Sequence, residues 1–286
     1  VWNGSSGFVG TQALTLSGSV TLAQASTLGV TGTLTVSGPV SDGGANLGLT
    51  KAGAGFLVLT GTNAYGGTTT VAGGVLSVGG TAALPGWNVA GRYSVTDGGA
   101  IAVPNTVADA DVATMLATGN FTSGGAIGFD TSAGDRTRSA ALTGAVGLAK
   151  IGTNGLILSA SNSFTGPAIV YSGSLVLQNQ FAVQNSLLTV QSGARVVFDQ
   201  GVAGRAFTAG GLAGSGTVSL VNNAATPATI ALTVGGANAT TSFAGTLTGS
   251  GNLVKVGSGT QTLAGGNINY TGTTTVNAGT LYLNDT

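Results

Sequence analysis

Two pairs of closely spaced carboxylates could carry out acid–base chemistry in this chain: Asp109 with Asp111, and Asp130 with Asp135. Paired carboxylates cleave glycosidic bonds when one acts as a general acid and the other as a base or nucleophile. Each pair lies in a stretch that interrupts the regular pattern of the rest of the chain. We therefore expect both pairs to lie in surface loops, and we assign no catalytic residue.

The side chains that nucleophilic catalysis and metal binding usually need are absent from the sequence. The 286 residues include no His and no Cys, which excludes Ser-His-Asp and Cys-His nucleophile systems. Zinc, haem and iron–sulfur sites lose their usual ligands for the same reason. Eight acidic and eight basic residues give a net charge of +0, so there is no basic footprint for nucleic acid. We predict a protein that is not an enzyme and that has no cofactor and no metal site.

The lysines point to a repeat. All of them, Lys51, Lys150 and Lys255, occupy one position of a motif that recurs 99 and then about 105 residues further along the chain. Such a row could bind anionic glycans. We favour the alternative that each lysine is solvated at the edge of a coil, where its charge discourages pairing with another edge.

Other repeated or clustered side chains have similar alternatives. Tyr65, Phe164 and Tyr270 share a repeat position and could stack on sugars, but we interpret them as packing or corner residues. The densest charge lies between residues 128 and 138, where we expect two acids and two bases to pair with one another at the surface. These four residues are Asp130, Asp135, Arg136 and Arg138.

Short strands with glycine corners set the architecture. Each copy of the motif contains three β-branched or aliphatic runs separated by Gly or Asn, which adopt the positive φ that tight turns need. Even spacing without hairpin signals favours an all-β fold, a parallel β-helix or β-solenoid of about 12 turns. Stacked equivalents of Asn63 would form a side-chain ladder along the axis. Residues 105–118 carry helical spacing and predict a short helical or loop insertion.

Composition supports this architecture and weakens others. Gly accounts for 52 residues and charged residues for only 6%, which leaves little material for solvated helices. The mean hydropathy is +0.42, but Gly, Thr, Ser and Asn interrupt every apolar run, so we expect no membrane span in this chain. We predict residues 1–286 to be a single continuous β-helix with homologous modules at about 49–80, 148–179 and 253–286.

The motif resembles a known repeat. Residues 251–259 read GNLVKVGSG and residues 270–281 read YTGTTTVNAGTL, and the copy that begins at Lys51 matches as well. The pattern is similar to the autotransporter-associated β-strand repeat, also called the passenger-associated transport repeat. The copy at Lys150 departs from it, since Asn154 replaces Gly and Pro167-Ala168 replaces the Thr pair. We expect a local irregularity there.

The resemblance implies an extracellular protein of the bacterial cell surface that is built as a right-handed parallel β-helix. Its repeats would serve transport and scaffold formation without catalysis. We expect a β-helical rod that acts as a stalk, an adhesin scaffold or a self-assembling fibre subunit. Its partners would be copies of itself stacked end to end as a filament, or further repeats of the same chain, because an uncapped coil exposes unpaired strand edges. A glycan-binding adhesin passenger that contacts surface glycans is the alternative, and a β-helical polysaccharide-degrading enzyme is a more remote one.

Overall fold

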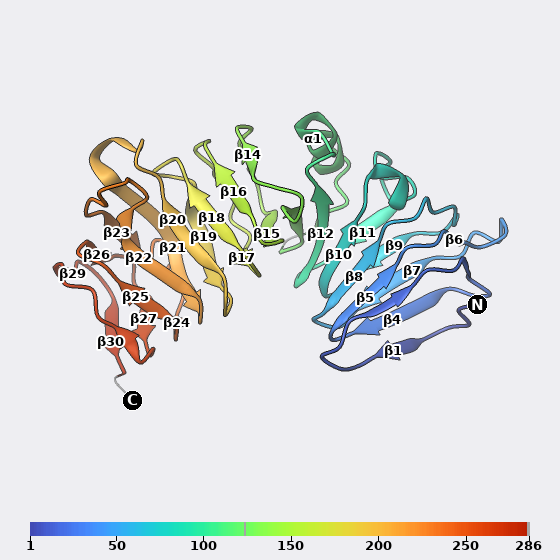
Figure 1. Cartoon of the computed structure of the whole chain (residues 1–286), viewed down its shortest axis with the longest axis horizontal. Helices are drawn as coiled ribbons and strands as arrows, with labels where there is room; N and C mark the ends of the chain where they lie inside the picture. Colours follow the sequence, from blue (N-terminus) through green and yellow to red (C-terminus); the bar gives the residue numbers. More distant parts are fainter. Residues whose placement is uncertain (123, 285–286) are drawn as a thin grey trace. The chain divides into compact units, whose positions relative to one another are not determined.

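The structure is a computed structural model that describes residues 1–122 and 124–284 (Figure 1). It is a mostly-β solenoid of about 13 turns with one short helix. The last two residues of the third predicted module, 253–286, lie outside the described range. Contacts divide the chain into two compact units, Val1–Asp130 and Thr131–Thr286, which are described separately below.

The first unit winds through thirteen strands, one helix and one 3-10 turn. Its elements are β1 Ser6–Phe8, β2 Leu14–Leu16, β3 Val20–Thr21, β4 Ser26–Val30, β5 Thr33–Val36, β6 Val40–Ser41, β7 Leu49–Ala52, β8 Phe56–Leu59, β9 Thr69–Val71, β10 Gly74–Val78, η1 Thr81–Ala83, β11 Tyr93–Val95, β12 Gly99–Pro104, α1 Asp109–Ala117 and β13 Ala126–Asp130. One sheet has the order β1-β4-β7-β9-β11, a second runs β2-β5-β8-β10-β12-β13, and β3 pairs with β6. Strands that neighbour each other in a sheet come from successive turns.

The second unit repeats this winding with seventeen strands and one 3-10 turn. Its elements are β14 Arg136–Arg138, β15 Gly147–Ile151, β16 Gly155–Leu158, β17 Ala168–Val170, β18 Ser174–Leu177, β19 Val183–Val190, β20 Arg195–Phe198, η2 Ala203–Arg205, β21 Ala206–Gly214, β22 Thr217–Asn222, β23 Ala231–Val234, β24 Thr241–Phe243, β25 Thr246–Thr248, β26 Asn252–Lys255, β27 Thr260–Leu263, β28 Asn267–Ile268, β29 Thr274–Val276 and β30 Thr280–Leu283. One sheet has the order β15-β17-β19-β21-β23-β26-β29. A branch leaves this sheet at β21, where β24 pairs with β21, β27 with β24, and β30 with β27. The other has the order β14-β16-β18-β20-β22-β25-β28.

The pairing between these strands is parallel throughout the described sheets, as in β5 with β8 and β16 with β18. Parallel neighbours from successive turns are the property that separates a solenoid from a sandwich of hairpins. The predicted parallel β-solenoid is thereby confirmed, while its right-handed sense stays a prediction.

The core of each unit is a set of apolar rows in which one residue per turn lies on its equivalent in the next. In the first unit Leu34, Leu57, Leu76, Ile101 and Ile127 pair in this way from β5 to β13, and all five are fully buried. Burial of each such side chain stabilises the fold by about 1.5–3 kcal/mol relative to its exposure. Since the strand period is two, the residues between them face outward.

An equivalent row runs through the second unit. Its members are Leu156, Leu175, Val196, Val218 and Leu247, on β16, β18, β20, β22 and β25. The row depends on register, because a slip of one residue would turn every member outward. The interior is therefore narrow, and each turn is buried only by its two neighbours.

The insertion between β12 and β13 contains the helix, α1, as the sequence predicted (Figure 1). Val112 and Met115 are buried, and the Tyr93 hydroxyl donates a 2.9 Å hydrogen bond to the Met115 carbonyl. Asp109 and Asp111 occupy the first helical turn, where a negative charge interacts favourably with the helix dipole. No helix among residues 1–122 and 124–284 has the length and apolarity to cross a bilayer.

Candidate functional site

Each repeat contains a buried lysine whose ammonium group is held by the backbone of two successive turns. Lys51 ends the inner row of β7 and is 0% exposed. Its Nζ donates hydrogen bonds to the carbonyls of Ala52 at 3.0 Å, Gly53 at 2.7 Å and Gly73 at 3.0 Å. Ala52 and Gly53 directly follow the lysine in the same turn of the solenoid, and Gly73 lies 22 residues later, in the next turn. We call this arrangement a lysine clip.

The other two copies build the same clip. Lys150 Nζ donates to Ile151 at 2.9 Å, Gly152 at 2.7 Å and Ser172 at 3.0 Å. Lys255 Nζ donates to Val256 at 2.6 Å, Gly257 at 2.9 Å and Ala278 at 3.3 Å. In every copy the acceptors lie one, two and 22 or 23 residues after the lysine. An ammonium group has three N–H donors, so each clip matches donors to acceptors one for one.

Glycines bring the two turns close enough for the clip to close. Gly53 and Gly74 have φ of 79° and 62°, in the left-handed region that favours glycine. A Cβ on Gly74 would lie 2.4 Å from the carbonyl oxygen of Gly55 and 2.5 Å from that of Gly53. The third acceptor, Gly73, directly precedes Gly74 in the chain. The K-x-G motif thus supplies the donor and two acceptors of the clip, and Gly74 allows the next turn to bring the third acceptor close.

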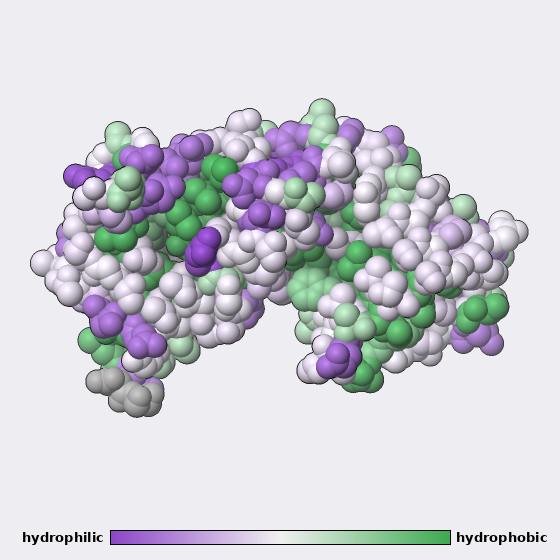
Figure 2. Space-filling model, viewed as in Figure 1, coloured by the Kyte–Doolittle hydropathy of each residue, from purple (hydrophilic) through white to green (hydrophobic). Residues whose placement is uncertain are grey.

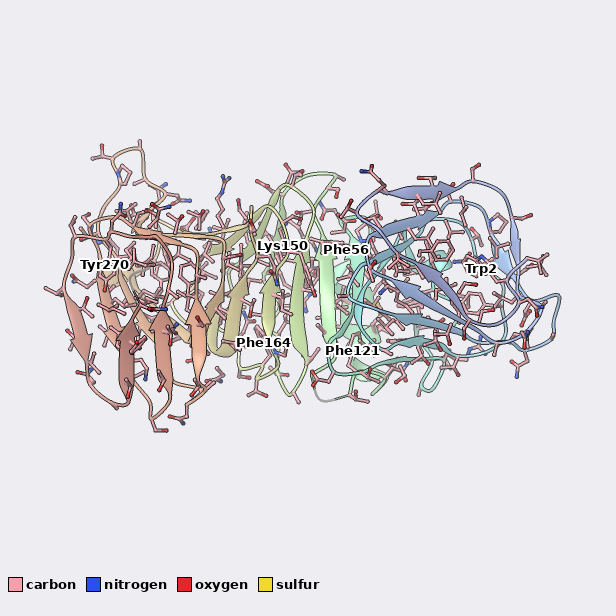
Figure 3. All side chains as sticks on the ribbon, turned by 90° about the horizontal axis from the view of Figure 1, so that it is seen from below. Trp2, Phe56, Phe121, Lys150, Phe164 and Tyr270 are labelled. Carbon is pink, nitrogen blue, oxygen red and sulfur yellow. The ribbon has the colours of Figure 1, made fainter. Side chains whose placement is uncertain are left out.

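Burial and hydrogen bonding act in opposite directions on the charge of the clip. Loss of hydration lowers the pKa of Lys51 from 10.5 to about 8. Three carbonyl oxygens favour the protonated form, because only the ammonium group fills all of them. The sequence-based expectation of solvated lysines at a coil edge is wrong. All three lysines are buried, so they form no row of exposed charges that could bind a glycan. Figure 3 labels one of them, Lys150.

Asparagine side chains make a second kind of link between turns. Asn63 accepts a 2.8 Å hydrogen bond from the Val40 amide and donates a 2.7 Å bond to the Ala83 carbonyl. Asn162 repeats this with the Leu142 amide and the Ala182 carbonyl, both at 2.8 Å. Each asparagine thus joins the turn before it to the turn after it.

The predicted asparagine ladder is therefore wrong. These amides bind backbone groups rather than one another, because the neighbouring turns present a free N–H on one side and a C=O on the other. In the third copy Asn267 is exposed, since it lies in the final turns. We call the links formed by Asn63 and Asn162 asparagine bridges.

The repeated aromatic residues pack inside the corners, as predicted. Tyr65 and Phe164 are each 1% exposed, and Tyr270 is half-buried. The Tyr65 hydroxyl shares a 2.6 Å hydrogen bond with Thr69 Oγ1, and Tyr270 does the same with Thr274 Oγ1 at 2.5 Å. Burial raises the pKa of Tyr65 to about 12. The burial of Tyr65 and Phe164 leaves no exposed aromatic stack for a sugar at these two positions.

The middle copy is as regular as the others, contrary to expectation. Its clip has the same geometry, and β17 occupies the position of β9 with the same burial pattern. Asn154 replaces a glycine but donates from Nδ2 to the Thr131 carbonyl at 2.8 Å. The substituting side chain therefore adds a link to the preceding turn, and no distortion follows.

The predicted acidic pairs do not share one role. Asp109 and Asp111 sit at the start of α1, as described above. Asp130 accepts a 3.2 Å hydrogen bond from Ser77 Oγ, and exposed Asp135 accepts a 2.6 Å bond from the Gly155 amide. No group of three or more Asp, Glu, His or Cys gathers in the part of the chain that the structure describes.

The prediction that both arginines of the charged stretch lie at the surface is wrong. Arg136 and Arg138, on β14, are 8% and 2% exposed rather than lying at the surface. Their alternation with exposed Thr137 puts them on the inward face of the strand. The alternation R-T-R of a strand would have predicted that both arginines face inward, but the prediction followed their charge instead.

Two further buried polar side chains, Gln261 and Asp42, were not predicted from the sequence. Gln261 binds both the amide and the carbonyl of Leu212, at 3.1 and 2.8 Å, and accepts from Thr241 Oγ1 at 2.8 Å. Asp42 accepts from the amides of Leu47 and Gly66, each at 2.8 Å, and these bonds lower its pKa. The bond from Asp42 to Gly66 and the bond between Gln261 and Thr241 link successive turns, as the lysine clips and asparagine bridges do, whereas Leu212 lies 49 residues from Gln261.

The last turn shows what an uncovered repeat looks like. Val71 and Val78 of the first copy are 0% and 2% exposed, whereas their equivalents Val276 and Leu283 are 48% and 62% exposed. The residues have the same place in the motif, so the difference in exposure comes from whether a later turn of the described chain packs on them. A hollow of about 200 Å³ lined by Leu263, Ile268 and Leu283 lies at the same end.

The repeats match an established family profile, the Passenger-associated-transport-repeat, at residues 49–78, 148–177 and 253–283. The chain is also 35% identical over 272 residues to the Adhesin BmaC autotransporter of Brucella suis biovar 1 (strain 1330). That match covers 84% of this chain and 7% of the relative, so the chain spans a small part of the relative's length. No solved structure matches. The chain is thus a β-solenoid like those of autotransporter adhesin passengers, with three passenger-associated transport repeats and distant homology to BmaC.

Proposed function

We propose that this chain is a non-catalytic scaffold segment of a secreted or surface-exposed adhesin passenger, a β-helical rod that acts as a stalk. The observation that carries the proposal is the lysine clip. All three lysines of the chain are buried, and each donates hydrogen bonds to backbone carbonyls of its own turn and of the next turn. A scaffold needs strong links between adjacent turns. Here the three lysine side chains form such links, so their amino groups are not presented to a substrate.

The similarity to an autotransporter adhesin supports the same role and the surface or secreted location. The asparagine bridges support it too, since they bind the turns before and after them. Neither kind of link leaves a reactive group at the surface.

The parallel stacking of the turns supports end-to-end association. Among the described residues, Val276, Tyr282 and Leu283 are exposed, and so are Val9 and Leu14. The strands at both ends are parallel members of the same kind of sheet, so a turn from a second copy of this chain, or from further repeats, would continue the stack. We propose this filament-like stacking as the partner interaction of the rod.

The test is a comparison of purified chain with two variants. Analytical ultracentrifugation over a range of concentrations should show end-to-end association that Leu283→Asp weakens at least tenfold, because a charge then faces the docking turn. Val89→Asp is the matched control, since Val89 is also exposed but lies outside the end turns. Equal association of the three proteins would overturn the stacking.

The catalytic alternative is tested separately. Polysaccharides incubated with the wild-type chain should release no shorter fragments. Release that disappears in the Asp130→Asn, Asp135→Asn double variant would overturn the scaffold proposal in favour of a glycan-cleaving enzyme.

A further inference from the structure

Basic side chains are rarely accessible in this protein, although the sequence contains eight of them. The three lysines are held in their clips, Arg136 and Arg138 are buried on β14, and Arg92 is half-buried against backbone carbonyls of the preceding turn. Figure 2 shows that most of the surface in view is neither strongly hydrophilic nor strongly hydrophobic. An enzyme that recognises a basic side chain therefore meets two exposed candidates, Arg195 and Arg205.

The two exposed arginines differ in how the backbone around them is held. Arg195 begins β20 and pairs with Ser174 on one neighbouring strand and with Thr217 on the other. Its Nε also donates a 2.7 Å hydrogen bond to Ser174 Oγ. Arg205 lies at the end of the loop 199–205, which joins β20 to β21 in the second unit (Figure 1). Because exposed loops are the preferred places of proteolytic cutting, the backbone at Arg205 is accessible to a protease and the paired backbone at Arg195 is not.

The end of the loop that carries Arg205 is weakly held. Residues 203–206, which flank the bond after Arg205, are all exposed. The Arg205 amide donates a 3.1 Å hydrogen bond to the Val202 carbonyl, three residues earlier in the same loop. A bond that ties the loop to another turn, from the Gln200 amide to Asn223 Oδ1, lies at the other end of the loop. The end with Arg205 can therefore extend at the loss of few hydrogen bonds.

The backbone conformation at Arg205 also favours opening of the loop. The φ of Arg205 is 51° and that of Gly204 is 73°. Glycine adopts this left-handed region without strain, but a residue with a Cβ does so at a cost in free energy. Extension of the loop in the cleft of a protease releases Arg205 from this conformation.

Two aromatic rings close the base of the loop. Phe198, the last residue of β20, and Phe207, the second residue of β21, are each 1% exposed, and their ring centroids lie 4.8 Å apart. Beyond them, β21 pairs with β19 and β22 pairs with β20. These contacts join the residues before the loop to the residues after it, so they persist when a bond inside the loop is cut.

We propose that the Arg205–Ala206 bond is a cleavage site for serine proteases that cut after basic residues, and that the cut chain stays assembled. The acidic pocket of such an enzyme takes the Arg205 guanidinium, and water hydrolyses the peptide bond to a carboxylate on Arg205 and an amino group on Ala206. Ala206 is exposed at the first position of β21, so only the end of a strand has to open. The site goes beyond the stalk role, and its failure would leave the clips and the stacking untouched.

Trypsin is the probe, added in small amount to the full chain in native buffer, and the fragments are followed over time by gel electrophoresis and mass spectrometry. The first products should be residues 1–205 and 206–286. On gel filtration without denaturant, the two fragments should elute together at the volume of the uncut chain. Arg205→Gln should slow the loss of intact chain at least tenfold, because glutamine brings no charge to the acidic pocket.

Two further variants separate recognition of the side chain from access to the loop. Arg195→Gln removes the same charge from the other exposed arginine, and its rate of cleavage should stay within twofold of wild type. Arg205→Lys keeps a basic side chain in the same loop, and it should be cut at the same bond within fivefold of the wild-type rate. Circular dichroism of each variant checks that the fold is retained.

Four results would overturn the proposal. The first is that trypsin cuts after Arg92 or Arg195 before it cuts after Arg205. The second is that wild type and Arg205→Gln are digested at equal rates. The third is that cleavage of wild type begins only at temperatures at which the chain unfolds, since the loop of the folded chain would then be closed to the protease. The fourth is separation of the two fragments on gel filtration, which would show that the cut chain does not stay assembled.

Discussion

Replacement of Lys51 by Met removes the ammonium group of the first clip and keeps a straight apolar side chain in its place. The carbonyls of Ala52, Gly53 and Gly73 then lose their shared donor. Three charge-assisted bonds contribute roughly 1.5–3 kcal/mol each, and the recovered cost of dehydrating the ammonium group offsets several kcal/mol of this. We expect a net loss of about 3 kcal/mol in the free energy of unfolding.

This loss is measurable by circular dichroism or calorimetry. For a unit of this size a change of about 3 kcal/mol lowers Tm by roughly 6–12 °C. Lys255→Met is the internal control. Its third acceptor, Ala278, is 3.3 Å away and lies in the exposed last turn, where water replaces the lost donor. The Tm of Lys255→Met should therefore fall by less than half as much.

Two results would refute the reasoning. If Lys51→Met unfolds within 1 °C of wild type, the carbonyls do not depend on the ammonium group. If Lys51→Met and Lys255→Met lower Tm equally, the cover of a following turn does not control the strength of the clip.

The remaining predictions concern the same links. Asn63→Ala should cost about 2–4 kcal/mol in chemical denaturation, because an amide and a carbonyl of two different turns lose their partners, while Asn3→Ala at the exposed start should have little effect. Gly74→Ala should prevent the native fold of the first unit, as judged by proteolysis, because its Cβ would lie 2.4 Å from a carbonyl oxygen. An amine-reactive reagent at neutral pH should label the Val1 amino group and leave all three lysines unlabelled by mass spectrometry until the chain unfolds. Between pH 8 and 10.5 the unfolded chain holds a proton that folded Lys51 has lost, so the Tm advantage of wild type over Lys51→Met should grow from pH 7 to pH 10, and a shrinking advantage would contradict the lowered pKa.

The sequence was sufficient to predict the solenoid because its information is periodic. Lys51, Gly53 and Leu59 have equivalents in each copy, and the alternation within strands gives the inward rows directly. The insertion was predictable for the opposite reason, since the segment that became α1 lacks both glycine and the two-residue period.

The partners of the polar side chains could not be predicted in this way. A lysine at a fixed repeat position is equally compatible with a solvated edge and with a buried cage, because the difference depends on carbonyls 22 residues away. Arg138 shows the same problem, because its charge suggested the surface while its place in the strand put it inside.

The links between turns have a common length that explains why this chain can place charged residues in its interior. Asn63, Asn162 and Gln261 each reach a partner 20 residues away, and the lysine clips reach 22 or 23, which is one turn in every case. A buried polar group is costly when its partner must be found by chance packing, but in a solenoid the next turn always presents the same backbone atoms at the same height. Each new turn therefore satisfies the polar groups of the one before it and leaves its own for the next. The stability of any turn then depends on its neighbours more than on its composition.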